Sequence, residues 1–234
     1  MAGSRFLRYE LRTTDVNAAC AFYADVLGSH FWDSDVSVVT LPEQAVALGA
    51  PAHWLGYVGA GDVEGTAGRI VALGGQQLGP TRATNESVNV VLRDPFGAVM
   101  ALSSETVAPR RSSVAWHLHH SQDHERSFEL YAALFGWGAT DAKELAPRMG
   151  RHQVFTWDES GRSVGSMTDI VSPEVHPQWL FFFQVADIEH ALAKVSARGG
   201  LALARTQTST GDIVVPCDDP QGAAFALYQV AHAQ

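Results

Sequence analysis

The feature of the sequence that most restricts its fold is an internal repeat. The segments His53-Trp54, Asp62, Gly74-Gly75 and Asp94-Pro95 recur 125 residues later as Gln178-Trp179, Asp187, Gly199-Gly200 and Asp219-Pro220. The stretch from Tyr9 to Gly28 likewise matches the stretch from His117 to Gly136, with an offset of 108 residues. A chain that repeats in this way is built from similar supersecondary units, and a motif present in only one copy marks either local function or chance.

Four segments of the chain predict the same local structure. Each begins with a strand, and the four strands are expected at Phe6–Arg12, His53–Val58, Val114–His120 and Trp179–Val185. An aspartate follows each strand and is expected to cap a helix, because its carboxylate accepts the free N–H groups of the first turn. These are Asp15, Asp62, Asp123 and Asp187, and the helices are expected to end at Gly28, Gly74, Gly136 and Gly199.

Further strands follow each helix, so the fold class is α+β with four strand–helix–strand modules. Asp94-Pro95-Phe96-Gly97 and Asp219-Pro220-Gln221-Gly222 are expected to form type I turns of hairpins in the second and fourth modules. We place one domain at residues 1–105 and the other at 114–234, with a linker at 103–113. The first module is shorter than the third by 17 residues, so either the first has lost residues from its later strands or the third has gained them. The sequence leaves open whether modules pair within a domain or are exchanged between domains.

Composition and charge restrict the partners of the chain. It is 46% hydrophobic and 18% charged, which is ordinary for a globular protein, and its net charge of −9 argues against a nucleic-acid groove. No stretch is apolar for the 18 or so residues that span a bilayer, and no signal peptide is visible. We therefore expect a cytoplasmic protein, monomeric or homodimeric, that binds a small molecule and neither nucleic acid nor membrane.

The paired strand–helix–three-strand modules resemble the vicinal oxygen chelate superfamily, which includes glyoxalases, bleomycin resistance proteins and extradiol dioxygenases. The resemblance rests on Thr13-Thr14-Asp15, Phe22-Tyr23 and Leu27-Gly28 after the first strand, on the two Asp-Pro-x-Gly-Ala turns, and on Leu134–Trp137. It covers essentially the whole chain in tandem, two-domain form. It implies four modules of the βαβββ type in two domains, but it does not identify a reaction, because the superfamily contains enzymes and drug binders.

The resemblance also implies where a metal would bind, and these positions lack ligands. Metal-dependent members carry His or Glu seven residues before the capping aspartate and Glu on the last strand. The corresponding residues here are Arg8, Leu55, Trp116, Leu180, Ala101 and Ala226, none of which suits a divalent cation. We therefore expect no metal and no other cofactor. His117, His119, His120 and His124 are the main alternative ligands, although we favour hydrogen-bonded histidines at a domain seam.

Alternation along the first strands predicts the residues of a concave binding face. We expect a small-molecule pocket rather than a filled barrel interior, because aromatic and aliphatic residues are interspersed with a few polar ones. The candidate binding residues are Arg8, Arg12, Tyr57, Trp116, His117, Leu118, Leu180, Phe182 and Gln184. The candidate acid/base residues are His120 and Glu10, the former because imidazole titrates near neutral pH. We expect the functional pocket in the C-terminal half, which has the fuller set of strands.

Four functions remain open at this point. The favoured hypothesis is a metal-independent protein that binds, acts on or sequesters an apolar aromatic metabolite. The second is a metal-independent isomerase, cyclase or lyase of secondary metabolism with His120 or Glu10 as the general base. A metal-dependent glyoxalase or dioxygenase is disfavoured by the missing ligands, and an interaction protein with filled barrels is the fourth alternative.

Overall fold

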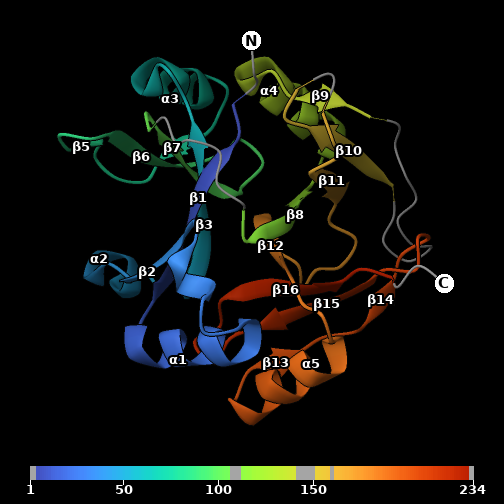
Figure 1. Ribbon diagram of the computed structural model, residues 1–234. Helices are drawn as coiled ribbons and strands as arrows, with labels where there is room; N and C mark the ends of the chain where they lie inside the picture. The colour runs from blue at the N-terminus through green and yellow to red at the C-terminus, as the bar shows by residue number, and fades with distance from the viewer. Residues whose placement is uncertain (1–3, 106–111, 141–150, 159–160, 232–234) are drawn as a thin grey trace. The chain divides into compact units, whose positions relative to one another are not determined.

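The computed structural model describes residues 4–105, 112–140, 151–158 and 161–231 and contains the four modules (Figure 1). The first module comprises β1 (Phe6–Thr13), α1 (Val16–Leu27), the 3-10 helix η1 (Phe31–Asp33), β2 (Val36–Thr40) and α2 (Glu43–Ala47). The second comprises β3 (His53–Gly59), α3 (Val63–Ala72), β4 (Gln76–Gln77), β5 (Arg82–Ala83), β6 (Val88–Arg93) and β7 (Val99–Ser103). The third comprises β8 (Val114–Ser121), α4 (His124–Phe135), β9 (Gly138–Ala139), β10 (His152–Thr156) and β11 (Gly165–Asp169). The fourth comprises β12 (Gln178–Gln184), α5 (Ile188–Ala197), β13 (Leu201–Ala202), β14 (Thr206–Gln207), β15 (Ile213–Asp218) and β16 (Ala224–Gln229).

The four main helices begin at the predicted aspartates. The carboxylates of Asp15, Asp62, Asp123 and Asp187 each accept a hydrogen bond from the backbone N–H three residues later, at 2.9–3.0 Å. Each helix is followed by a glycine with positive φ: Gly28 (106°), Gly74 (101°), Gly136 (71°) and Gly199 (82°). The predicted helix boundaries are therefore confirmed, because a side chain would be strained at these glycines.

The two Asp-Pro-x-Gly turns also form as predicted. Gly97 N–H donates to the carbonyl of Asp94 at 3.1 Å, and Gly222 N–H donates to that of Asp219 at 2.9 Å. These turns join the antiparallel hairpins β6–β7 and β15–β16. In each turn the aspartate Oδ1 atom accepts two further backbone N–H groups, which leaves Oδ2 available for partners elsewhere.

The described strands form a seven-stranded sheet from β1 to β7 and a nine-stranded sheet from β8 to β16. The strand β2 pairs in parallel with β1, as β11 pairs in parallel with β8. In the third module β9 and β10 extend the sheet beyond β11, and the described part of the first module has no counterpart of them. The difference in length between the first and third modules corresponds to this edge of the sheet.

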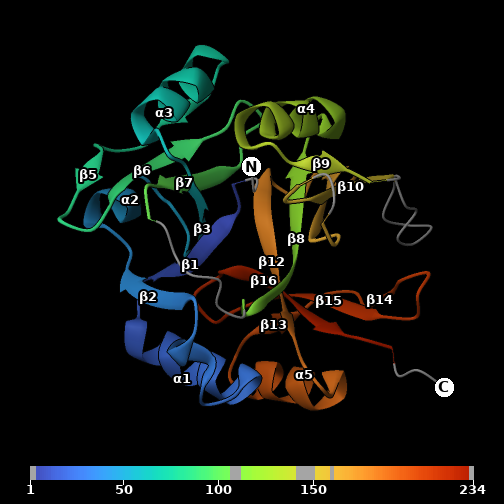
Figure 2. The ribbon, with the colours of Figure 1, turned by 45° about the horizontal axis from the view of Figure 1, so that its top comes forward.

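By packing, the chain divides into two compact units that combine modules from different halves of the sequence. The first unit contains most of modules two and three, within Met1–Arg8, Gly56–Pro109 and Trp116–Trp179. The second contains most of modules one and four, within Tyr9–Leu55, Arg110–Ala115 and Leu180–Gln234. In the second unit α1 and α5 lie side by side in both views (Figures 1 and 2). Modules are therefore exchanged between the two halves of the sequence, which is one of the two alternatives that the sequence left open.

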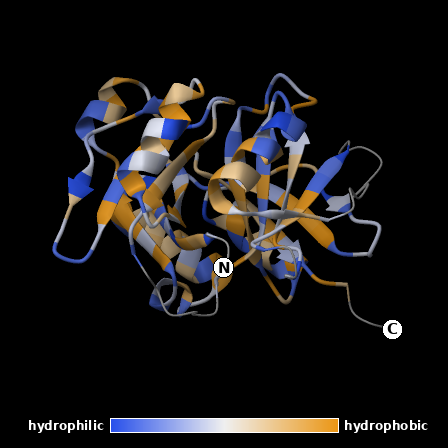
Figure 3. Ribbon diagram, turned by 90° about the horizontal axis from the view of Figure 1, so that it is seen from above, coloured by the Kyte–Doolittle hydropathy of each residue, from blue (hydrophilic) through white to orange (hydrophobic). Residues whose placement is uncertain are grey.

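Aromatic side chains form the core of each unit. In the first unit Trp137 stacks on Phe155 with ring centroids 4.7 Å apart, and in the second Tyr23 stacks on Phe31 at 5.8 Å. Hydrophobic and hydrophilic residues alternate along the elements in Figure 3, as expected when one face is buried. These large side chains remove much apolar area from water, which is the dominant stabilising term of folding.

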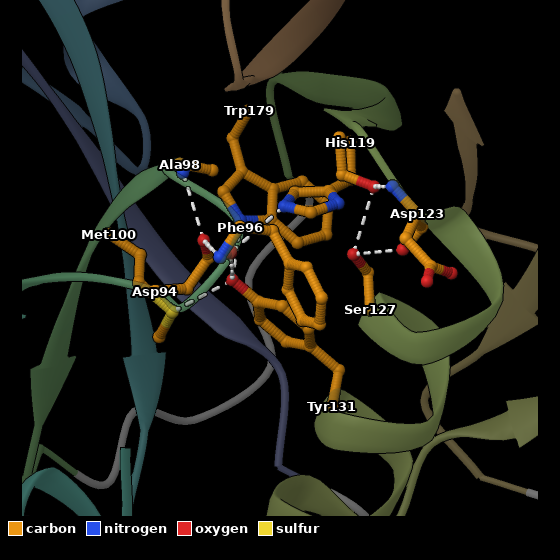
Figure 4. Close-up of polar contacts among 10 residues, drawn as sticks. Asp94, Phe96, Ala98, Met100, His119, Asp123, Ser127, Tyr131 and Trp179 are labelled. Carbon is orange, nitrogen blue, oxygen red and sulfur yellow. Dashed lines mark hydrogen bonds and ion pairs between the residues drawn. The ribbon is translucent and has the colours of Figure 1, made fainter. Parts of the chain in front are cut away.

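One buried polar arrangement recurs in both units. In the first unit, Trp179 Nε1–H donates to the Tyr131 hydroxyl at 3.0 Å, and Tyr131 donates to Oδ2 of Asp94 at 2.9 Å (Figure 4). In the second, Trp54 donates to Tyr23 at 2.9 Å, and Tyr23 donates to Oδ2 of Asp219 at 3.2 Å. We call these arrangements the Trp–Tyr–Asp relays.

Each relay connects the two halves of the sequence. Tyr131 lies on α4 while Asp94 lies in the β6–β7 turn, and Tyr23 lies on α1 while Asp219 lies in the β15–β16 turn. Burial and the adjacent aspartate raise the pKa of both tyrosines well above the ordinary value, so both hydroxyls remain donors. The landmarks of the repeat therefore meet in space through hydrogen bonds.

We predict that Tyr131→Phe and Tyr23→Phe each lower the free energy of unfolding by about 1–3 kcal/mol. Removing the hydroxyl leaves a buried tryptophan N–H without its acceptor and a carboxylate oxygen with one donor fewer. Urea unfolding measures the effect. Tyr228→Phe is the matched control, because its hydroxyl bonds Asp212 in a half-buried environment, and it should cost less. Equal losses in all three variants would contradict a special role for the relays.

Candidate functional site

The candidate site lies on one face of strands β8, β10 and β11, at residues of the first unit. The register pairs Leu118 with Ser166 and His120 with Thr168 across β8 and β11, and His152 with Thr168 across β10 and β11. Directly paired residues share a face, and residues two apart on a strand also do. We call the face that carries Trp116, Leu118, His120, His152, Val154, Thr156, Ser166 and Thr168 the β8 face.

A chain of hydrogen bonds fixes the aromatic residue of the β8 face. Trp116 Nε1–H donates to the Ser166 hydroxyl oxygen at 3.2 Å, and that hydroxyl lies 3.1 Å from Nδ1 of His152. Both Ser166 and His152 are fully buried, whereas Trp116 is partly exposed. Because the indole N–H is already satisfied, Trp116 offers a partner mainly its apolar ring surface.

His120 differs from its neighbours on this face because it has no hydrogen-bond partner among the described residues. Its Nδ1 atom is buried and unpaired. Burial is the main cause that lowers the pKa of His120 to about 4, and the nearby His119 and His152 lower it further. The ring is therefore neutral at neutral pH, so the expectation that it titrates near pH 7 is wrong for this environment. Its role as an acid/base remains a prediction.

The equivalent strand of the first half carries polar residues that pair with one another. Arg8 lies 3.4 Å above the ring of Tyr57 and donates to Glu105 at 3.1 Å and to Asn89 at 3.4 Å. These four residues all belong to the first unit.

In the second unit, Arg12 donates to Glu10 at 2.9 Å. Arg12 is the counterpart of His120 in the repeat, so the same position is an ion-paired arginine in one copy and an unpaired histidine in the other.

The other histidines of β8 and α4 are hydrogen-bonded. His117 Nδ1–H donates to the Val164 carbonyl oxygen at 2.8 Å, and the ring stacks on Phe6 at 5.0 Å. His119 Nε2 lies 3.0 Å from Oδ2 of Asp94, and His124 Nδ1 lies 3.0 Å from Asp169. The preference for hydrogen-bonded histidines over a metal cluster is supported by these contacts. His117 and His119 lie on the face opposite to the β8 face, so His117 does not join the candidate binding residues there.

The predicted site residues thus fall into three groups. Trp116, Leu118 and His120 share the β8 face in the first unit, and Arg8 and Tyr57 form the cluster described above. Glu10, Arg12, Leu180, Phe182 and Gln184 belong to the second unit, where Leu180 and Phe182 are buried and Gln184 is exposed.

Sequence reasoning missed His152, Ser166 and Thr168. Only the register of β10 and β11 with β8 brings these residues to the same face.

The residues at the metal positions of the superfamily do not fit a cation. Leu55, Leu180, Ala101 and Ala226 are buried and apolar, Arg8 is paired with Glu105, and Trp116 with Ser166. Within the described ranges there is no group of three His, Cys, Asp or Glu side chains placed to hold a metal ion. Divalent cations need several converging oxygen, nitrogen or sulfur ligands, so these positions cannot supply a centre of the superfamily type.

Comparison with known proteins agrees with this architecture. The model of the Glyoxalase/Bleomycin resistance protein/Dioxygenase superfamily matches residues 119–227. CFP32 of Mycobacterium bovis, provisionally named a glyoxylase, is 26% identical over 251 residues, which cover 96% of this chain and 94% of that protein. The crystal structure of the 2,3-dioxygenase LapB from Pseudomonas sp. KL28 has a TM-score of 0.60 and 14% identity, covering 99% of this chain and 94% of that one. The Mn(II)-bound glyoxalase from Novosphingobium aromaticivorans has a TM-score of 0.56 and 13% identity, covering 97% and 82%.

The matched segment 119–227 belongs to the Glyoxalase/Bleomycin resistance protein/Dioxygenase superfamily, which confirms the resemblance identified in the sequence. The solved structures share the α+β fold over nearly the whole chain, so the tandem arrangement of modules is confirmed as well. Among the helices that the structure describes, none has the length and apolar character of a membrane span.

We predict that the protein loses stability as the pH falls from about 6.5 to about 4. Burial lowers the pKa of His117, like that of His120, from 6.5 to about 4, so the folded protein holds both rings neutral while the unfolded chain takes up protons. The loss is on the order of 3 kcal/mol for each ring at the acid end and is absent above pH 7. Urea unfolding across this range measures it.

His117→Phe should flatten this pH dependence. The phenyl ring keeps the stacking on Phe6. The Val164 carbonyl loses the imidazole donor but still accepts a hydrogen bond from the backbone N–H of residue 117, at 3.1 Å. His30→Gln, at an exposed position, is the control and should retain the slope of the parent protein. An unchanged slope in His117→Phe would show that this ring does not contribute.

Proposed function

We propose that the chain is a metal-independent small-molecule-binding protein of the glyoxalase/bleomycin-resistance type, which binds or sequesters an apolar aromatic metabolite at the β8 face. The observation that carries the proposal is the single unpaired polar side chain, His120, on a face whose other polar groups are hydrogen-bonded where the structure describes them. The protein encloses Nδ1 of His120, so a ligand would meet the ring at Nε2, which is not among the buried unpaired atoms.

The replacement of the metal-position residues supports metal independence. One structural relative is a Mn(II)-bound glyoxalase, but at 13% identity only its fold is shared with this chain. In this chain the corresponding positions hold leucine, alanine, arginine and tryptophan, so the ligand chemistry of such a centre is not carried over.

An aromatic ligand is supported by the composition of the face. Trp116 and Leu118 provide apolar surface, and a few fixed polar groups lie beside them, which is the usual make-up of a small-molecule site. The C-terminal half also has β9 and β10, which the first half lacks among its described residues, and this supports our choice of that half.

An isomerase, cyclase or lyase remains the alternative. Neutral His120 can accept a proton, but a group with a pKa of about 4 is a weak base. Glu10 is paired with Arg12 in the second unit, which lowers its availability as a base. Turnover of a bound ligand, rather than stoichiometric binding alone, would favour this alternative.

We predict that Trp116→Ala weakens binding of planar two- and three-ring aromatic compounds by about 1–3 kcal/mol, the scale for one large aromatic contact. Quenching of tryptophan fluorescence and calorimetry measure it. Trp116→Phe should retain part of the affinity because it keeps an apolar ring. Trp32→Phe, on η1 in the second unit, is the control and should leave affinity unchanged. Loss of binding in the control but not in Trp116→Ala would mean that the ligand binds in the other unit.

We further predict that the purified protein carries no stoichiometric metal and that dialysis against a chelator leaves ligand binding unchanged. The physical reason is the lack of converging ligands at the metal positions. Elemental analysis measures it. About one Zn, Fe, Mn or Ni per chain that resists dialysis would refute metal independence without affecting the assignment to the superfamily.

A further inference from the structure

The unpaired histidine of the β8 face restricts the chemistry of the ligand through its tautomer. A neutral imidazole carries one N–H and one lone pair. Nδ1 of His120 is buried and has no hydrogen-bond partner among the described residues. Nε2, at the tip of the ring, is not among the buried unpaired atoms. A buried N–H without an acceptor is rarer in proteins than a buried acceptor without a donor. The proton therefore belongs on Nε2, and His120 presents a hydrogen-bond donor.

The charge of the face adds a second restriction. None of the residues that define the β8 face is lysine or arginine, and His120 is neutral because of its lowered pKa of about 4. An anionic ligand would lose its hydration at this face without gaining a compensating cation, which is costly. The acceptor that His120 meets is therefore a neutral oxygen or nitrogen atom.

The length of the ligand follows from the spacing along β8. Trp116 and His120 lie four residues apart on one face, so their Cα atoms are about 13 Å apart at about 3.3 Å per residue. Leu118 lies between them and is almost fully buried. A compound that contacts both the indole ring and the imidazole tip must be elongated and apolar along its middle.

We infer that the β8 face recognises an elongated, neutral aromatic carbonyl compound, whose rings lie on Trp116 and whose carbonyl oxygen accepts a hydrogen bond from Nε2–H of His120. The inference rests on the proposed binding function and adds the class of ligand to it. His119, on the opposite face of β8, is bonded to Asp94 at 3.0 Å and fixes the strand next to His120. The residue that corresponds to His119 in the first copy is Leu11, which cannot bond a carboxylate. The hydrogen bond that fixes β8 next to His120 is therefore specific to the second copy.

Three probes of the same shape test the inference. They are 2-acetylanthracene, which has a neutral carbonyl, 2-ethylanthracene, which has none, and 2-anthracenecarboxylate, which has a charged acceptor. We expect the acetyl compound to bind about three- to ten-fold more tightly than the ethyl compound, the effect of one neutral hydrogen bond. The carboxylate should bind most weakly of the three.

Variants at His120 separate the hydrogen bond from the packing. His120→Phe keeps a ring but removes the donor, so the preference for the acetyl compound should disappear. His120→Gln retains an amide N–H at a similar reach and should keep part of the preference. His124→Gln, at the ion pair with Asp169, is the control and should bind all three probes as the parent protein does.

Nitrogen-15 NMR of labelled histidine tests the tautomer without any ligand. We expect a protonated Nε2 and an unprotonated Nδ1 for His120 near neutral pH. The opposite tautomer, a tighter-binding carboxylate, or equal affinity for the acetyl and ethyl probes would overturn the inference while leaving aromatic binding intact. Failure of all three probes to bind would overturn both the inference and the proposed function.

Discussion

In each compact unit, one aspartate carboxylate is shared between its own turn and a tyrosine on a helix far away in the sequence. Oδ1 of Asp94 closes the β6–β7 turn, while Oδ2 accepts the hydroxyl of Tyr131 on α4. A buried carboxylate is tolerated only when its oxygen atoms are satisfied. The turn and the docking of the helix therefore depend on each other, and the same device recurs with Asp219 and Tyr23. These bonds explain why the units combine different halves of the sequence.

The repeat also shows where the two copies have diverged. Leu11 of the first copy corresponds to His119 of the second, which adds a fourth donor to the buried carboxylate of Asp94, beside two backbone N–H groups and Tyr131. Arg12 corresponds to His120, which replaces an ion-paired side chain by an unpaired neutral one. Both changes fall on adjacent positions of β8, one on each face of the strand. We interpret this pair of positions as the place where the second copy acquired its specific role.

The superfamily supplies the fold but not the chemistry of this chain. Its structural relatives include a dioxygenase and a glyoxalase, yet the positions that hold the metal in metal-dependent members are apolar or already paired here. The function must therefore be argued from the site, because one fold hosts many activities. The β8 face offers a fixed aromatic ring, a buried hydrogen-bond chain and one unpaired imidazole, which suit recognition of a neutral ligand better than activation of a charged intermediate.

The sequence by itself determined the modules, because capping aspartates, terminal glycines and Asp-Pro-x-Gly turns act over a few residues and are readable locally. It also located the difference in length between the first and third modules and the positions without metal ligands, since the repeat aligns them. Only the tertiary structure decided which modules pack together, that Tyr131 meets Asp94, and that His152 and Ser166 join Trp116 and His120 on one face. It also decided the charge of His120, because the lowered pKa arises from burial by residues distant in the sequence. Long-range register and desolvation depend on how the whole chain packs, and no local pattern records them.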